Sequence, residues 1–118
     1  IDACLVGSEM CIRDSYNVDE IAAIPGVDAL LIGTNDLCME MGIPGQLDHP
    51  DIVEAYKKTI AACKKHNKHA GMGGIYEPNL IDKYIDMGIR MVLGGNDLSL
   101  MISAGKNQTF KIRSNFTG

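Results

Sequence analysis

Residues 29–37 read ALLIGTNDL, and residues 91–98 read MVLGGNDL. Each stretch is an apolar run that ends in a glycine, one spacer residue and Asn-Asp-Leu. A run that is apolar on both faces is typical of a buried parallel strand. Glycine, asparagine and aspartate favour the turn that follows such a strand. The repeat therefore predicts two parallel strands, each followed by a tight turn into a helix.

The residues around the repeat predict an alternation of strands and helices. Pro50 suits the first turn of the longest helix, where a missing N–H costs nothing, and Gly88 closes a second helix. The expected strands are 27–32, 69–74 and 89–93. The expected helices cover about 20–23, a turn that ends near 42, 50–67, 78–88 and a last helix from 98. Strands that recur about every thirty residues between helices indicate right-handed crossovers and an α/β fold with a parallel sheet.

The longest predicted helix shows which of its faces is buried. Apolar or small side chains recur at helical spacing, so they form one stripe, while the lysines fall outside it. The stripe is Ile52, Ala55, Tyr56, Thr59, Ile60 and Cys63. This pattern predicts that the helix packs on the sheet and presents its lysines to solvent.

Composition limits the possible functions of the chain. Its 118 residues, 46% of them hydrophobic and 22% charged, suit one globular domain. A net charge of −4 and the absence of tryptophan argue against a nucleic-acid partner. No apolar run reaches the ~20 residues that cross a membrane, so we expect no membrane partner and a cytoplasmic location. The four cysteines form no Cys-x-x-Cys pair, and we expect free thiols.

Two interpretations of the Asn-Asp-Leu turns remain open at this level. Asp36 and Asp97 suit the cap of the helix that follows each strand. Equally, a carboxylate at the carboxyl end of a parallel strand, beside a glycine that exposes backbone N–H groups, can hold a cation together with an anionic ligand. The ends of parallel strands are where α/β folds carry their sites.

Several stretches, in order and at matching spacing, resemble the HpcH/HpaI aldolase family. The similarity runs from about residue 17 to about residue 113. The stretches that carry it are VDEI at 18–21, IPGVD at 24–28, IGTNDL at 32–37, MGIPGQ at 41–46, HP at 49–50 and VLGGNDLSL at 92–100.

The resemblance implies that residues 16–118 are the C-terminal portion of a (β/α)8 TIM barrel, with about three parallel βα units. Such enzymes are class II aldolases, which cleave 4-hydroxy-2-oxo acids such as 4-hydroxy-2-oxoheptanedioate into pyruvate and an aldehyde. They use Mg²⁺, Mn²⁺ or Co²⁺, and a metal acts there as a Lewis acid. Two alternatives stay open: an acyl-CoA lyase like the citrate lyase β-subunit, and a non-catalytic α/β module that binds an anion.

The resemblance also implies roles for individual residues. Asp36 would be a metal ligand, and it would bind the 2-oxo acid together with Gly33, Thr34 and Asn35. Gly73 would line the aldehyde pocket and leave it wide. The family assigns Asp97 no metal role, so we expect it to cap its helix.

The family's metal-binding Glu, its acid/base His and its substrate-binding Arg have no match in residues 16–118. We therefore expect the chain alone to be inactive, with these groups in an N-terminal part of a longer parent that forms a homo-oligomer, a hexamer by resemblance. Residues 4–15, CLVGSEMCIRDS, resemble a translated sequencing adapter. We interpret residues 1–15 as non-native; the alternative is a divergent strand that includes residues 3–6.

Overall fold

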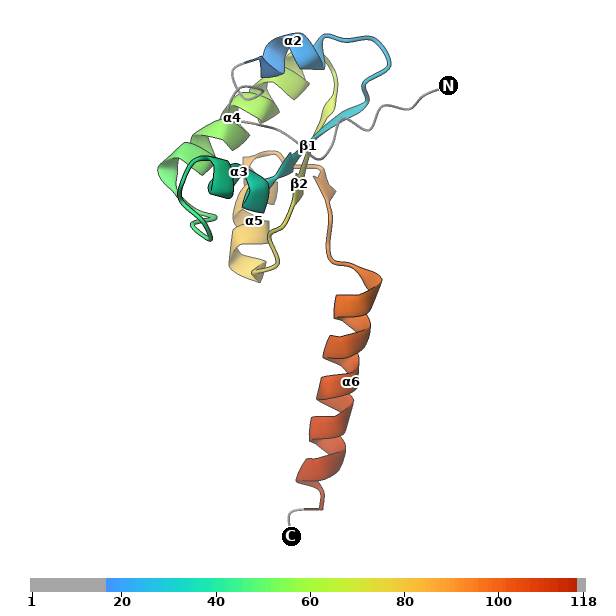
Figure 1. The fold of residues 1–118 in the computed structure, drawn as a ribbon. Helices are drawn as coiled ribbons and strands as arrows, with labels where there is room; N and C mark the ends of the chain where they lie inside the picture. The colour runs from blue at the N-terminus through green and yellow to red at the C-terminus, as the bar shows by residue number, and fades with distance from the viewer. Residues whose placement is uncertain (1–16, 117–118) are drawn as a thin grey trace.

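The structure is a computed structural model that describes residues 17–116 (Figure 1). The segment 1–15 lies outside the described residues. Within them the chain alternates between helices and strands, as the sequence pattern predicts. The elements are helix α2 Val18–Ala22, strand β1 Ala29–Gly33, helix α3 Thr34–Glu40, helix α4 Pro50–Lys65, strand β2 His69–Gly73, helix α5 Pro78–Met87, strand β3 Met91–Val92 and helix α6 Asp97–Ser114.

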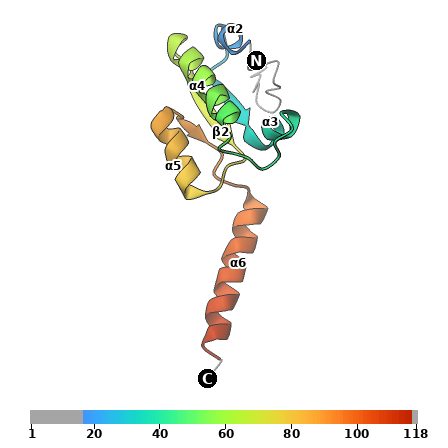
Figure 2. The same ribbon diagram turned by 90° about the vertical axis from the view of Figure 1, so that its left-hand side faces the viewer.

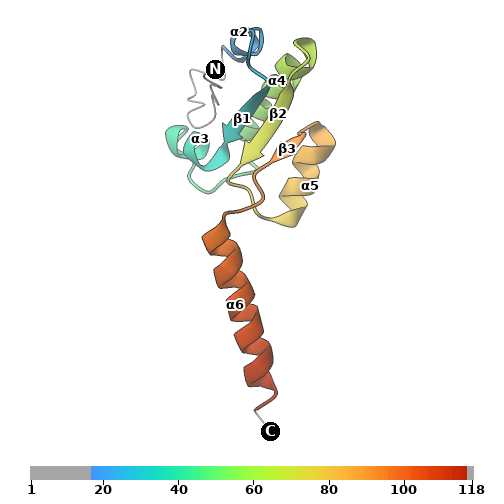
Figure 3. The same cartoon turned by 90° about the vertical axis from the view of Figure 1, so that its right-hand side faces the viewer.

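The strands form one parallel sheet in the order β1-β2-β3, seen side by side in Figure 3. In the register of β1 and β2, Gly33 lies opposite Gly73. The last residues of both strands therefore meet at one edge of the sheet. This register brings the start of α3, which directly follows β1, against the end of β2.

Helix α4 covers one face of the sheet, together with α5 (Figure 2). The side chain of His49, the residue before the helix, accepts a hydrogen bond from the Asp51 N–H at 3.3 Å. All six residues of the predicted stripe are buried. The prediction for α4 is therefore confirmed. The helix could be predicted because a proline in its first turn and a long apolar period both indicate a helix.

The opposite face of the sheet carries no helix of the described residues (Figure 3). A Cβ atom placed on Gly71 would lie 2.9 Å from Leu31 Cδ1 and 3.0 Å from Met91 Cε. The side chains of the two outer strands thus close over the glycine of the middle strand. This face is apolar and partly exposed.

Besides shifts of one or two residues at the ends of other elements, two predicted details differ from the structure. Strand β3 pairs over two residues, Met91 and Val92, although the apolar run predicts 89–93. The cap of α6 is Asn96, whose side chain accepts the Ser99 N–H at 2.8 Å, and not Asp97. Asp97 is the first helical residue, and its carboxylate accepts the N–H of Leu98 at 2.8 Å. Adjacent Asn and Asp both suit a cap, and the position of Ser99 three residues after Asn96 selects Asn96.

Helix α6 extends away from the sheet and its covering helices (Figure 1). Every one of its residues is exposed, including Leu98, Met101 and Phe110. None of the described helices is both long and apolar enough to cross a membrane. The two cysteines in the described part of the chain, Cys38 and Cys63, are free and buried, as expected.

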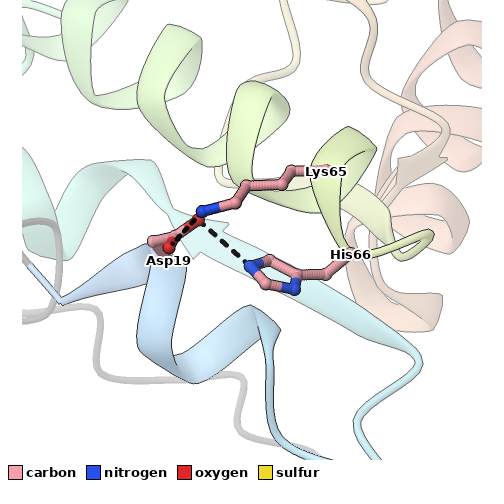
Figure 4. A network of polar contacts seen from close by, with 3 residues as sticks. All are labelled: Asp19, Lys65 and His66. Carbon is pink, nitrogen blue, oxygen red and sulfur yellow. Dashed lines mark hydrogen bonds and ion pairs between the residues drawn. The ribbon is translucent and has the colours of Figure 1, made fainter.

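An ion-pair cluster joins α2 to the end of α4 (Figure 4). The Asp19 carboxylate accepts a hydrogen bond from Lys65 Nζ at 2.8 Å and lies 3.1 Å from His66 Nε2. The hydrogen bond from Lys65 lowers the pKa of Asp19 below its ordinary value, and His66 adds to the effect. The charged form of Asp19 is therefore the form that the folded chain favours.

We expect the stability contribution of Asp19 to depend on pH. Its folded-state pKa is lowered, so the contribution is complete above the unfolded pKa of about 4 and is lost as pH falls through the lower folded value. Asp19→Asn should therefore lower the unfolding temperature at pH ~6 and change it less at pH ~3. Thermal unfolding at both values measures this, with Glu20→Gln, an exposed carboxylate on the same helix, as control. An equal difference at both pH values would contradict the assignment.

Candidate functional site

A hollow opens at the edge of the sheet where β1 and β2 end. It encloses about 280 Å³, close to the lower limit for small-molecule pockets. All five residues predicted for the site line it, and three further residues complete the wall. The lining is Leu31, Gly33, Thr34, Asn35, Asp36, Gly73, Gly74 and Leu93. The structure therefore brings the first turn of α3 and the end of β2 together at the carboxyl ends of parallel strands.

Thr34 and Asn35 attach the first turn of α3 to the end of β2. The Thr34 hydroxyl donates to the Gly73 carbonyl oxygen at 2.8 Å, and the Asn35 side-chain amide donates to the Gly74 carbonyl oxygen at 3.1 Å. Thr34 is fully buried, whereas Asn35 is exposed. Gly74 has φ +85°, and a Cβ atom there would lie 2.8 Å from Asn35 Nδ2. A glycine is needed at this position both for its backbone conformation and for the approach of Asn35.

Asp36 is exposed at the mouth of the hollow, and its carboxylate turns back toward the end of β1. A Cβ atom on Gly33 would lie 3.3 Å from Asp36 Oδ2. Gly33 is the N-cap of α3, and no side chain caps the helix. Asp36 therefore does not cap α3. The first N–H groups of a helix have no partner within it, so here they are available to an anion beside a free carboxylate.

The far wall of the hollow is apolar. A Cβ atom on Gly73 would lie 3.1 Å from Leu93 Cδ1, so Leu93 occupies the space that a larger residue at 73 would need. Sequence reasoning missed Leu93, because it falls at the end of an apolar run and looks like a core residue. Its side chain is 49% exposed. Leu93 lies directly before the second glycine motif, and this position could have indicated that it belongs to the site.

Tyr56 does not line the hollow, but it contacts Thr34, and sequence reasoning did not predict this link to the site. It belongs to the buried stripe of α4, and its hydroxyl lies 2.7 Å from Thr34 Oγ1. Burial raises the pKa of Tyr56 well above its usual range, although the bond with Thr34 acts in the other direction. The phenol therefore stays protonated and can donate.

The donor set suits a divalent cation only in part. Within residues 17–116, no group of three His, Cys, Asp or Glu side chains gathers where a metal ion could be held. Mg²⁺ usually takes one or two carboxylates, with water and substrate oxygens as its other ligands. Asp36, exposed in a hollow wide enough for water and a small acid, fits as one such carboxylate.

Comparison with known proteins identifies relatives of this chain. The family model "HpcH/HpaI aldolase/citrate lyase" matches residues 3–104. The chain is 36% identical over 92 residues to a hydroxypyruvate/pyruvate aldolase from Roseobacter denitrificans, covering 78% of this chain and 36% of the relative. It is 35% identical over 88 residues to a 5-keto-4-deoxy-D-glucarate aldolase from Klebsiella pneumoniae, covering 75% of this chain and 34% of that protein.

Solved structures match the fold. An HpcH/HpaI aldolase/citrate lyase family protein from Burkholderia cenocepacia superposes with a TM-score of 0.77 and 29% identity, over 87% of this chain and 40% of that one. An HpcH/HpaI aldolase from Desulfitobacterium hafniense gives a TM-score of 0.74 at 25% identity, with the same coverage of 87% and 40%. The predicted α/β fold, with three parallel strands that match part of an aldolase barrel, is confirmed.

The chain spans only about a third of the length of the two aldolase relatives: 36% of the Roseobacter relative and 34% of the Klebsiella relative. The range matched by the family model begins at residue 3, so it overlaps the segment 1–15, whose non-native origin stays a prediction.

Proposed function

Because the chain belongs to the HpcH/HpaI aldolase/citrate lyase family, we propose that it forms part of a divalent-metal-dependent class II aldolase. The reaction is the cleavage of a 4-hydroxy-2-oxo acid into pyruvate and an aldehyde. The observation that carries the proposal is the position of Asp36. Its carboxylate lies in a hollow at the strand ends, directly beside the uncapped first turn of α3.

Each part of the hollow has a role in this proposal. The Asp36 carboxylate would be one ligand of the metal ion. The backbone N–H groups of Asn35 and Asp36 bind the carboxylate of the 2-oxo acid, since the start of a helix favours negative charge. When bound, a divalent ion supplies Lewis-acid stabilisation of the charge that develops as the carbon–carbon bond breaks.

The aldehyde half of the substrate lies on the apolar side of the hollow in this proposal. Gly73 and Leu93 form that wall, and neither carries a charge that would select a charged aldehyde. We therefore propose 4-hydroxy-2-oxoheptanedioate as a test substrate and not as the preferred one. Further metal ligands, the acid/base histidine and the substrate arginine would come from a longer parent protein, which we propose assembles as a homo-oligomer.

The test is a cleavage assay on the full-length protein that contains this chain. We expect pyruvate to form from 4-hydroxy-2-oxoheptanedioate, to stop forming when EDTA removes the metal, and to form again when Mn²⁺ or Mg²⁺ is added. Cleavage that persists after complete chelation would contradict the proposal. Cleavage of an acyl-CoA substrate instead would favour a citrate lyase type of reaction. Stabilisation by pyruvate without any cleavage would favour a non-catalytic anion-binding module.

A further inference from the structure

Two buried polar side chains connect three elements behind the hollow. Thr34 is the first residue of α3, Tyr56 belongs to α4, and both side chains are 0% exposed. Thr34 Oγ1 lies 2.7 Å from the Tyr56 hydroxyl and 2.8 Å from the carbonyl oxygen of Gly73 in β2. Burial of two hydroxyls is costly unless both are hydrogen-bonded. The proposed reaction does not explain why polar groups stand here in place of aliphatic ones.

The direction of the hydrogen bonds follows from proton counting. A carbonyl oxygen only accepts, so the single Thr34 hydroxyl proton points to Gly73. The Thr34 oxygen must then accept from Tyr56, whose phenol is protonated because burial raises its pKa. The result is a directed chain from Tyr56 through Thr34 to the Gly73 carbonyl. Removal of the Thr34 hydroxyl leaves the buried Tyr56 hydroxyl without its acceptor, and removal of the Tyr56 hydroxyl leaves the Thr34 oxygen without its donor.

This chain bears directly on the position of Asp36. Thr34 lies two residues before Asp36, in the same turn of a seven-residue helix. No side chain caps that helix, and two side-chain hydrogen bonds join its first turn to the end of β2: the one from Thr34 to Gly73 and the exposed one from Asn35 to Gly74. Of these two bonds, the one from Thr34 is shielded from water.

We propose that Tyr56 and Thr34 are positioning residues for Asp36. The chain of hydrogen bonds from α4 holds the first turn of α3 against the end of β2, and with it the Asp36 carboxylate and the neighbouring N–H groups. This inference rests on the proposed function, in which Asp36 is a metal ligand. It predicts that Tyr56, which does not line the hollow, affects the affinity for the metal through Thr34.

Tyr84 provides a matched control inside the same core. Its ring centroid lies 4.2 Å from that of Tyr56, and its side chain is also 0% exposed. Its hydroxyl donates to the Leu47 carbonyl oxygen at 2.7 Å, outside the hollow. Tyr84→Phe therefore removes a part-buried hydrogen bond of the same length from the same core without removing a contact to α3.

The experiment compares variants of the full-length protein. Tyr56→Phe and Thr34→Val should each weaken Mn²⁺ binding about tenfold or more, in the range typical of groups that orient metal ligands. Thr34→Ser keeps the hydroxyl and should restore the affinity to within about twofold. Tyr84→Phe should lower the unfolding midpoint to a similar degree yet leave Mn²⁺ affinity unchanged. Equal Mn²⁺ affinity in the Tyr56→Phe and Tyr84→Phe variants would overturn the inference.

A second readout separates this inference from the proposed function. Hydrogen exchange of the peptide that covers residues 33–37, measured by mass spectrometry without metal, should accelerate in Tyr56→Phe and Thr34→Val but not in Tyr84→Phe. If the unmodified protein binds no Mn²⁺, Asp36 is not a metal ligand. The hydrogen-exchange rates then test by themselves whether Tyr56 and Thr34 hold the first turn of α3 in place. Unchanged exchange in Tyr56→Phe and Thr34→Val would overturn it.

Discussion

Asp36→Asn is expected to lower kcat/KM for cleavage of 4-hydroxy-2-oxoheptanedioate by about a thousandfold in the full-length protein. A bound metal ion contributes several kcal/mol of charge stabilisation, and each 1.36 kcal/mol corresponds to about a factor of ten in rate. Asparagine keeps the size of the side chain but loses the negative charge that holds the cation. The assay with added Mn²⁺ measures the loss.

The same variant should leave the fold intact. Asp36 is exposed and does not cap α3, so its replacement removes no buried contact. Asp97→Asn is the matched control, because it makes the same change in the second Asn-Asp-Leu motif, outside the hollow. The kcat/KM of the Asp97→Asn variant should stay within about twofold of that of the unmodified protein, because a substitution on the surface has little effect in general. Cleavage that survives Asp36→Asn with its metal dependence unchanged would contradict the ligand role.

Ile32→Ala is expected to have the largest effect on stability, a loss of about 2–5 kcal/mol. Ile32 is 0% exposed and belongs to the core between the sheet and its helices. Its truncation leaves a cavity one residue before Gly33, the first residue of the site's glycine motif. Even complete domains are stable by only about 5–15 kcal/mol, so a loss of this size should raise the unfolded population markedly. Urea denaturation of the 118-residue chain measures the change.

Leu31→Ala is the control, because neighbouring residues of a strand point to opposite faces. Leu31 is half-buried on the face without helices, so its truncation in the isolated chain should cost about 1 kcal/mol or less. In a full-length barrel this face would be interior, and the cost of Leu31→Ala should rise toward that of Ile32→Ala. Equal costs for the two variants in the isolated chain would show that the face is already covered there.

The sequence pattern predicted those elements whose signals are local. Helix α4 has a proline start and a long apolar period, and its predicted buried stripe is buried. The strand ends were harder to predict. An apolar run from 89 to 93 shows which residues avoid water but not how many of them pair with β2. Pairing depends on the partner strand, which lies about twenty residues earlier in the chain.

The residues of the candidate site that belong to the family's motif could be predicted from the sequence, whereas its other residues were not predicted. Gly33 to Asp36 and Gly73 were found from the motif and the resemblance, and the parallel register places them together. Tyr56 was assigned to the core by its periodicity, and this is correct for its ring. Its hydroxyl partner, Thr34, belongs to another helix, and the periodicity of one helix does not predict a side-chain bond to another.

Helix α6 is expected to unfold independently of the rest of the described chain, the α/β unit formed by the sheet and its helices. It spans 18 residues, and none of them packs on the sheet or its helices. An isolated helix near this length is marginal in water, and an interior glycine such as Gly105 costs about 1 kcal/mol more than alanine. In the monomeric chain, α6 therefore interconverts with coil in about a microsecond. Its melting is gradual and contributes nothing to the cooperative enthalpy of the α/β unit, so helical circular dichroism and calorimetry should report different transitions.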